Sequence, residues 1–138
     1  GSLLAGLAFS NASLGAVHAM AHSLGGFSDL PHGECNALLL ESVIDYNFDV
    51  CPGRYAAIAQ AMNIDCSSCK ESEVKQKILS ALQKLRLELG ITERLTDLGI
   101  GHEHLSELAR SAIKDPCMAT NPRKPTISDL ETIYGKAL

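Results

Sequence analysis

The chain has 138 residues, the size of one ordinary domain, and its 46% apolar and 20% charged residues predict a globular rather than a disordered protein. Aromatic residues make up only 4% and Trp is absent, so a helical fold is favoured over a β-sandwich or β-barrel. The net charge of −4 argues against a nucleic-acid-binding surface, which needs a basic stripe.

Predicted helices follow one another along the whole chain. A stretch rich in small apolar residues predicts a first, buried helix over residues 3–24, ended by Gly25–Gly26. Further helices are predicted over 32–47, from Pro52, over 71–89, as a short turn over 93–98, over 105–113, and from a cap at Thr126 and Asp129 to the chain end. No strand pattern or internal repeat interrupts them. The sequence therefore predicts an all-α helical bundle that forms a single domain over residues 1–138.

The first predicted helix is apolar enough to be compared with a membrane span or a signal peptide. It contains two histidines and several other polar residues, and no cation precedes it, which argues against both. The five cysteines are an odd number without repeated spacing, so a disulfide framework is not expected. The single CxxC pair, Cys66 and Cys69, lacks the second pair of a zinc site and is interpreted as two incidental loop cysteines. We expect a cytoplasmic protein that binds neither membranes nor nucleic acid.

Positive charge is absent from the first third of the chain. No Lys or Arg precedes Arg54, whereas five acidic residues and three of the five histidines lie in this stretch. This pattern fits a site that attracts a cation. It fits equally a buried segment in which long charged side chains are rare.

The strongest chemical pattern in the sequence is formed by three histidines. His18 and His22 are four residues apart and share one helix face, while His32 begins the next helix after a break that can fold the chain back. Neutral imidazoles bind zinc, iron, copper or nickel, and three of them leave positions open for a substrate oxygen. Because the face is expected to be buried and rich in Ala, these histidines need partners.

Several segments together resemble the iron-containing alcohol dehydrogenase family. They are Ala5–Asn11, Leu14–Gly15, His18–His22, Leu24–Gly26, Pro31–Gly33, Asn36–Leu40 and the closing segment Thr120–Arg123 with Thr126 and Asp129–Leu130. The resemblance covers the whole chain and is densest over residues 5–47. Two departures stand out, because Ser23 occupies a position where the family usually has Pro, and Glu41–Ser42 replaces a common Pro-His pair.

The resemblance implies the C-terminal part of a two-domain NAD(P)-dependent enzyme. In such an enzyme an N-terminal domain binds NAD or NADP, and a dehydroquinate synthase-like helical domain supplies most of the metal site. His18 and His32 match two ligands of the ion, Fe²⁺ or alternatively Zn²⁺, whereas His22 matches the catalytic histidine beside the nicotinamide and substrate. The family's upstream Asp–His ligand pair and its phosphate-binding loop have no counterpart in these 138 residues. The implied reaction is hydride transfer between an alcohol or aldehyde and NAD(P), and we expect this piece alone to be inactive.

Two other interpretations remain open. The chain could be a stand-alone helical metal-binding or interaction module, although an apolar start inside a helix-like pattern argues for a piece of a longer protein. It could also be one half of a split enzyme whose other half binds the nucleotide. Exposed Leu and Ala at a domain interface would favour self-association, so we expect a homo-oligomer.

Overall fold

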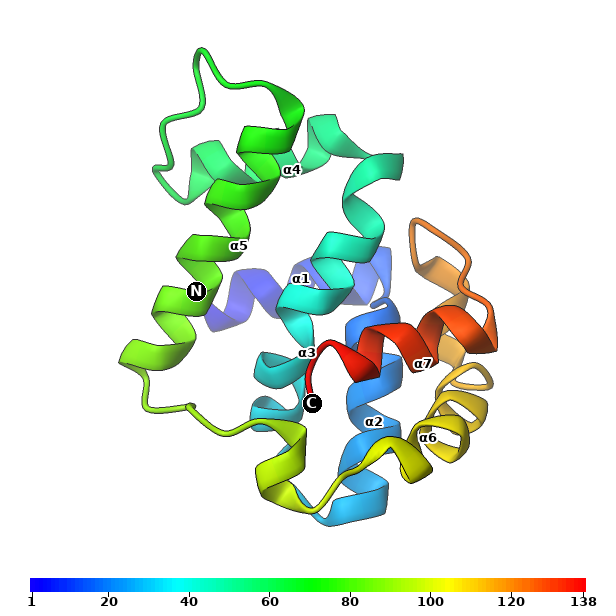
Figure 1. Cartoon of the computed structure of the whole chain (residues 1–138). Helices are drawn as coiled ribbons and strands as arrows, with labels where there is room; N and C mark the ends of the chain where they lie inside the picture. Colours follow the sequence, from blue (N-terminus) through cyan, green and yellow to red (C-terminus); the bar gives the residue numbers. More distant parts are fainter.

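A computed structural model describes residues 1–138 and contains seven α-helices and no β-strand (Figure 1). The α-helices are α1 (Ser2–Ala12), α2 (Ala16–Ser28), α3 (His32–Asn47), α4 (Pro52–Ala61), α5 (Glu71–Glu88), α6 (Leu105–Ala112) and α7 (Ile127–Gly135). Short 3-10 turns cover η1 (Phe48–Val50), η2 (Leu95–Leu98), η3 (His102–His104) and η4 (Pro116–Thr120). The predicted all-α architecture is confirmed.

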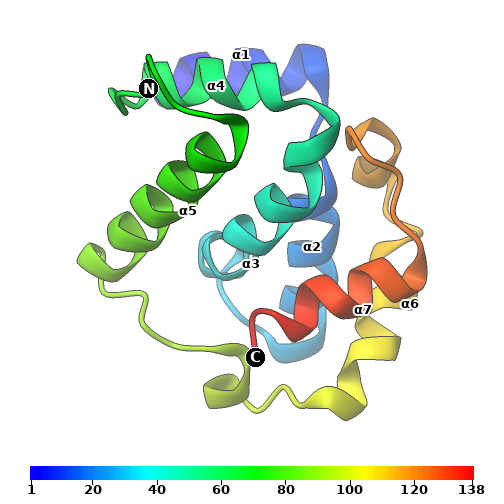
Figure 2. The ribbon, with the colours of Figure 1, turned by 45° about the horizontal axis from the view of Figure 1, so that its top comes forward.

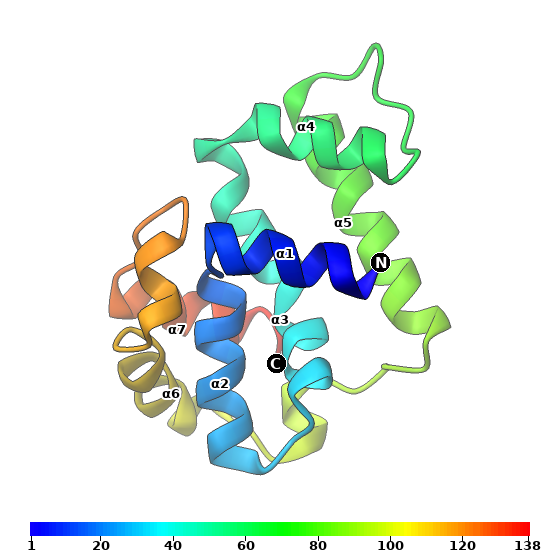
Figure 3. The same cartoon turned by 180° about the vertical axis from the view of Figure 1, so that it is seen from behind.

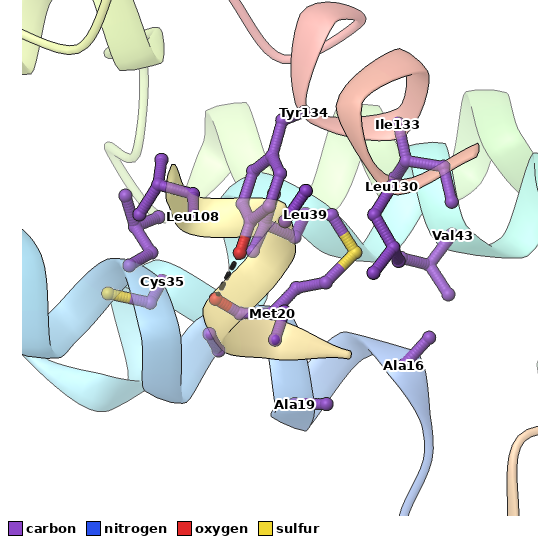
Figure 4. Close-up of a cluster of buried hydrophobic side chains, with 14 of the residues drawn as sticks. Ala16, Ala19, Met20, Cys35, Leu39, Val43, Leu108, Leu130, Ile133 and Tyr134 are labelled. Carbon is purple, nitrogen blue, oxygen red and sulfur yellow. Dashed lines mark hydrogen bonds between the residues drawn. The ribbon is translucent and has the colours of Figure 1, made fainter. Parts of the chain in front are cut away.

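The helices form two groups around two hydrophobic clusters. In the larger group α2 packs against α3 and α6, and α7 packs against α3 and α6 as well (Figures 1 and 2). Its core of 19 buried residues contains Tyr134, whose hydroxyl donates a 2.8 Å hydrogen bond to the Met20 carbonyl oxygen (Figure 4). The smaller group, α4 and α5, encloses Phe48, Tyr55, Ala59, Val74 and Ile78. Helix α3 contacts α2 in one group and α5 in the other and so joins the two.

The single first helix predicted over residues 3–24 is wrong, because the chain breaks after Ala12. Ser13 has a positive φ of 61°, and α1 and α2 meet at an angle of 103°. Helix α1 extends away from α2 on the side shown in Figure 3 and has no buried residue, so the expected burial holds for α2 alone. No single helix is long and apolar enough to cross a membrane, and α1 and α2 reach that length and apolarity only as this bent pair.

The end of α2 also differs from the prediction. The helix continues through Gly25 and Gly26 to Ser28, and the following residue, Asp29, has a left-handed φ of 54°. At Gly25 an added Cβ would lie 3.4 Å from the Leu30 carbonyl oxygen and 3.6 Å from Cys35 Sγ. The glycine therefore allows the following loop and α3 to approach closely rather than ending the helix.

Ion pairs connect the charged face of α5 to α3. Lys75 Nζ lies 2.7 Å from an Asp45 carboxylate oxygen, and Lys136 Nζ lies 2.5 Å from the other. Partial burial acts to raise the pKa of Asp45, but the two ammonium groups outweigh it and hold the pKa below its usual value. Arg86 Nε donates a 2.9 Å bond to Glu41, one of the residues at which the chain departs from the family pattern.

The last helix begins as its sequence predicts. Thr126 Oγ1 accepts a 3.1 Å hydrogen bond from the Asp129 amide, and Asp129 Oδ2 accepts a 2.8 Å bond from the Thr126 amide. This reciprocal capping box satisfies two amides at the helix start that have no partner within the helix. The predicted starts of α3, α4 and α5 at His32, Pro52 and Glu71 are confirmed too.

Candidate metal centre

The three histidines of the sequence pattern come together where the start of α3 lies beside α2. The ring centroids of His18 and His32 are 5.4 Å apart, those of His22 and His32 5.2 Å, and those of His18 and His22 6.2 Å. Contrary to the expected burial, His22 and His32 are exposed and only His18 is half-buried. The opposite side of α2, with Ala16, Ala19 and Met20, faces the core. The cluster therefore lies at the surface of the helical domain.

The environment of His18 favours its neutral form. Partial burial lowers the pKa of His18 first, and the neighbouring rings of His32 and His22 lower it further, against a weaker opposing effect of Asp115. Metal ions bind the neutral imidazole, since the coordinating nitrogen must offer a lone pair. The protonation state of His18 thus suits a ligand at neutral pH.

The separation of His18 and His32 fits two imidazoles on one ion. For metal–nitrogen bonds near 2.1 Å and a tetrahedral angle, the ring centroids should lie about 5.3 Å apart. The observed 5.4 Å agrees with that value, and the ring planes are tilted by 49°. The rings of His22 and His32 are instead nearly parallel, at 22°, which is a stacking arrangement rather than a shared coordination site.

His22 has a different partner, Asp115, from the segment between α6 and η4. Asp115 Oδ2 lies 2.9 Å from His22 Nδ1, and its other oxygen accepts a 2.8 Å bond from the Cys117 amide. Partial burial acts to raise the pKa of Asp115, but the bonds from His22 and Cys117 hold it below its usual value. An ionised Asp115 accepts a hydrogen bond, so His22 carries its proton on Nδ1 and its other ring nitrogen stays free.

His32 is held by its own helix. The side-chain nitrogen of Asn36, Nδ2, donates a 2.9 Å hydrogen bond to the His32 carbonyl oxygen and lies 3.0 Å from His32 Nε2. Asn36 Oδ1 is buried and has no hydrogen-bond partner within the chain. An unpartnered polar atom beside a candidate ligand is a feature expected of a site that further groups complete.

A buried pair of asparagines fixes the start of α2 at Ala16, two residues before His18. Asn121 Oδ1 accepts bonds from the Ala16 amide at 3.0 Å and from Asn47 Nδ2 at 2.9 Å, and Asn121 Nδ2 donates to Asn47 Oδ1 at 2.9 Å. A Cβ on Gly15 would lie 3.1 Å from Asn121 Oδ1, so a side chain at this position would crowd the Asn121 amide. The pair ties α2, α3 and the chain after η4 together.

Sequence reasoning missed these supporting residues. No sequence pattern pointed to Asp115 or Cys117, yet Cys117 is half-buried and its sulfur belongs to a compact cluster with His22 and Asp115. The Asp-Pro-Cys segment carried no periodic signal that could link it to His22. Ser23, where the family usually has Pro, donates a 2.9 Å bond to the Leu108 carbonyl oxygen and thereby ties α2 to α6.

A family model described as the C-terminal part of the Fe-containing alcohol dehydrogenase family matches residues 1–138. The chain belongs to the iron-containing alcohol dehydrogenase family. It is 40% identical over 136 residues to 1,3-propanediol dehydrogenase of Klebsiella pneumoniae, and 38% identical over 137 residues to lactaldehyde reductase of Escherichia coli K12. These alignments cover 99% of this chain but only 35% and 36% of the relatives, so the chain spans about one third of their length.

Solved structures of this family have the same fold. A crystal structure of 1,3-propanediol oxidoreductase matches with a TM-score of 0.95 at 40% identity, over 99% of this chain and 36% of that one. An alcohol dehydrogenase from Oenococcus oeni matches with a TM-score of 0.93 at 39% identity, over 98% and 35% of the respective chains. The helical bundle thus matches the C-terminal helical domain of iron-containing alcohol dehydrogenases, and the resemblance found in the sequence is confirmed.

Proposed function

We propose that this chain supplies part of the metal centre of an NAD(P)-dependent alcohol dehydrogenase, with His18 and His32 as metal ligands. The observation that carries the proposal is the pair of imidazoles 5.4 Å apart, one of them kept neutral by its surroundings. The ion would be Fe²⁺ or Zn²⁺, both of which accept nitrogen ligands. When bound, such an ion would supply a Lewis acid that polarises the substrate oxygen for hydride transfer to or from the nicotinamide.

His22 is proposed to act on the substrate side rather than as a ligand. Its Nδ1 is engaged by Asp115 at 2.9 Å, which fixes the ring orientation and leaves the opposite nitrogen available. From that position the ring would contact the nicotinamide and either orient the alcohol or relay its proton. A pocket of about 290 Å³ borders His22, Ser23 and Phe27 on the α6 side.

The remaining parts of the proposal concern the complete enzyme. Two of four family ligands and the dinucleotide-binding domain are expected from an N-terminal part, and the substrate is expected to be a small alcohol or aldehyde. One of the relatives, from Bacillus methanolicus at 32% identity, is named an NAD-dependent methanol dehydrogenase, which favours NAD as the cofactor.

The proposed location of the enzyme is the cytoplasm. All five cysteines are free, as a reducing compartment would favour.

A domain exchange tests the ligand assignment directly. The C-terminal part of the Klebsiella 1,3-propanediol dehydrogenase would be replaced by this chain, and metal content and alcohol-dependent NADH formation would be measured. His18→Ala and His32→Ala in the chimera should each lose bound metal and activity by more than 100-fold, on the order of a lost ligand's contribution. His102→Ala is the matched control, because His102 is exposed and lies on η3 outside the cluster, and it should change neither quantity.

The same chimera separates the alternatives. His22→Ala should retain the metal and lose turnover, which distinguishes a substrate-side residue from a ligand. Full metal occupancy in His18→Ala or His32→Ala would contradict the assignment. Tight stoichiometric metal binding by the 138-residue chain alone would instead favour a stand-alone metal-binding module.

A further inference from the structure

The CxxC pair lies in a tight turn between α4 and α5, away from the histidines. The Cys69 amide donates a 3.1 Å hydrogen bond to the Cys66 carbonyl oxygen, closing a four-residue turn with Ser67 and Ser68 at its corners. In such a turn the first and last Cα atoms lie less than about 7 Å apart. A disulfide needs a Cα separation of about 4.4–6.8 Å, so the backbone already holds the two cysteines at a compatible distance.

A cation stands beside one of the two sulfurs. The carbonyl oxygen of Asp65 accepts a 2.6 Å hydrogen bond from Lys77 Nζ and a 3.9 Å bond from Cys69 Sγ. The ammonium and the thiol therefore converge on one oxygen atom, and Cys69 is the leading cause that raises the pKa of Lys77. The Cys69 sulfur therefore has the Lys77 ammonium as a close cationic neighbour.

The other cysteine is in a different environment. Partial burial raises the pKa of the Cys66 thiol, and the neighbouring Cys69 raises it further. Cys66 packs beside the small hydrophobic cluster, and both sulfurs belong to residues that line an open pocket of about 690 Å³ between α4 and α5. The dithiol thus combines an attacking sulfur, a protonated partner within the same turn, and room for a peptide-sized reagent.

We propose that Cys66 and Cys69 form a reversible dithiol–disulfide site that exchanges with low-molecular-weight disulfides of the glutathione class. The Cys69 thiolate attacks one sulfur of the small disulfide, forms a mixed disulfide and releases one thiolate. Cys66 then gives up its proton and attacks Cys69 Sγ, and the second small thiolate leaves. The two cysteines lose two electrons in total, and the small disulfide becomes two thiols that take up the two protons released.

Mass spectrometry of the purified protein tests this site. The tryptic peptide Tyr55–Lys70 contains Cys66 and Cys69 and no other cysteine, so its redox state can be assigned without ambiguity. The reduced protein would be incubated anaerobically with a chelator and excess oxidised glutathione, then treated with iodoacetamide before digestion. The peptide should become two hydrogen atoms lighter and resist alkylation, and reduced glutathione should restore two alkylated cysteines.

Single variants separate the roles of the two sulfurs. Cys66→Ser should stop at the mixed disulfide and accumulate a glutathione adduct on Cys69. Cys69→Ser should lose the fast step, because Cys66 has the raised pKa. Lys77→Met should slow the first step severalfold, because it removes the ammonium beside the attacking sulfur. Lys84→Met is the matched control, as this exposed lysine of α5 pairs only with Glu88.

Three results would overturn the proposal. The first is a wild-type peptide that keeps both thiols in excess oxidised glutathione. The second is a wild-type mixed disulfide that does not close, and the third is a disulfide that joins either cysteine to Cys51, which packs against the same hydrophobic cluster. Equal exchange rates in Lys77→Met and Lys84→Met would remove the role assigned to the ammonium.

Discussion

The Asn47–Asn121 pair allows a quantitative test of how the start of α2 is held. Asn121→Ala removes the acceptor of the Ala16 amide and both partners of the Asn47 side chain. Ala16 is fully buried and Asn47 is only 4% exposed, so water reaches these groups poorly. Three buried polar groups would lose their partners together, namely the Ala16 amide and both polar atoms of the Asn47 side chain, and the Arg123 carbonyl oxygen would lose its donor as well.

The expected cost follows from the number of groups left unpaired. Each buried polar group without a partner costs about 1–1.5 kcal/mol here, so Asn121→Ala should lower the free energy of unfolding by about 4 kcal/mol. Asn47→Ala should cost less, about 2 kcal/mol, because Asn121 would keep its bonds to the Ala16 amide and the Arg123 carbonyl oxygen. The two changes should not add, and the double variant should fall short of their sum by about 1–2 kcal/mol.

Urea unfolding of the four proteins, with equal m-values as a check on two-state behaviour, gives the coupling energy. Asn11→Ala is a suitable control, because Asn11 is exposed on α1 and bonds only to the Leu7 carbonyl oxygen; it should stay within about 0.5 kcal/mol of wild type. Strictly additive single effects would show that the two amides do not act as a pair. If the free energy of unfolding of Asn121→Ala lay within about 1 kcal/mol of the wild-type value, the stabilising role of the Asn47–Asn121 pair would be refuted.

Three further changes test other parts of the fold. Asp45→Asn should lower the free energy of unfolding at neutral pH but not in strong acid. The pKa of Asp45 is depressed in the folded state, so its stabilising contribution is present above the unfolded value of 3.8 and is lost as pH falls through the lower folded value. An equal loss of stability at pH 2 and at pH 7 would contradict this reasoning. Tyr134→Phe should lower the free energy of unfolding by about 1 kcal/mol, because it removes the hydrogen bond to the Met20 carbonyl oxygen. The change is measured as a shift of the urea midpoint, and an unchanged midpoint would show that this bond makes no net contribution to stability. Leu7→Gln should leave the midpoint of thermal unfolding unchanged and reduce self-association measured by light scattering, because Leu7 is 54% exposed on α1. A large loss of stability would instead mean that α1 packs against the rest of the chain in solution.

Local signals in the sequence determined most helix positions. A proline at the first position of α4, the hydrophobic stripe of α5 and the Thr126–Asp129 box act within one or two turns, so they could be read without the fold. The same holds for the spacing of His18 and His22, because residues four apart share a helix face whatever surrounds the helix. The all-α class and the histidine pattern were therefore available from the residues alone.

The tertiary structure decided what distant segments do to these elements. The helix predicted through residues 3–24 breaks because Thr120 and Asn121, 106 and 105 residues away, bind the Leu14 carbonyl oxygen and the Ala16 amide at the break. His22 receives its carboxylate from Asp115, 93 positions along the chain. Such partners are chosen by how α2 packs against α6 and the segment that follows it, and no local period encodes that packing. The sequence by itself thus determined the all-α class, most helix positions and the histidine pattern, and only the packing of the helices decided where the first helix ends and what orients His22.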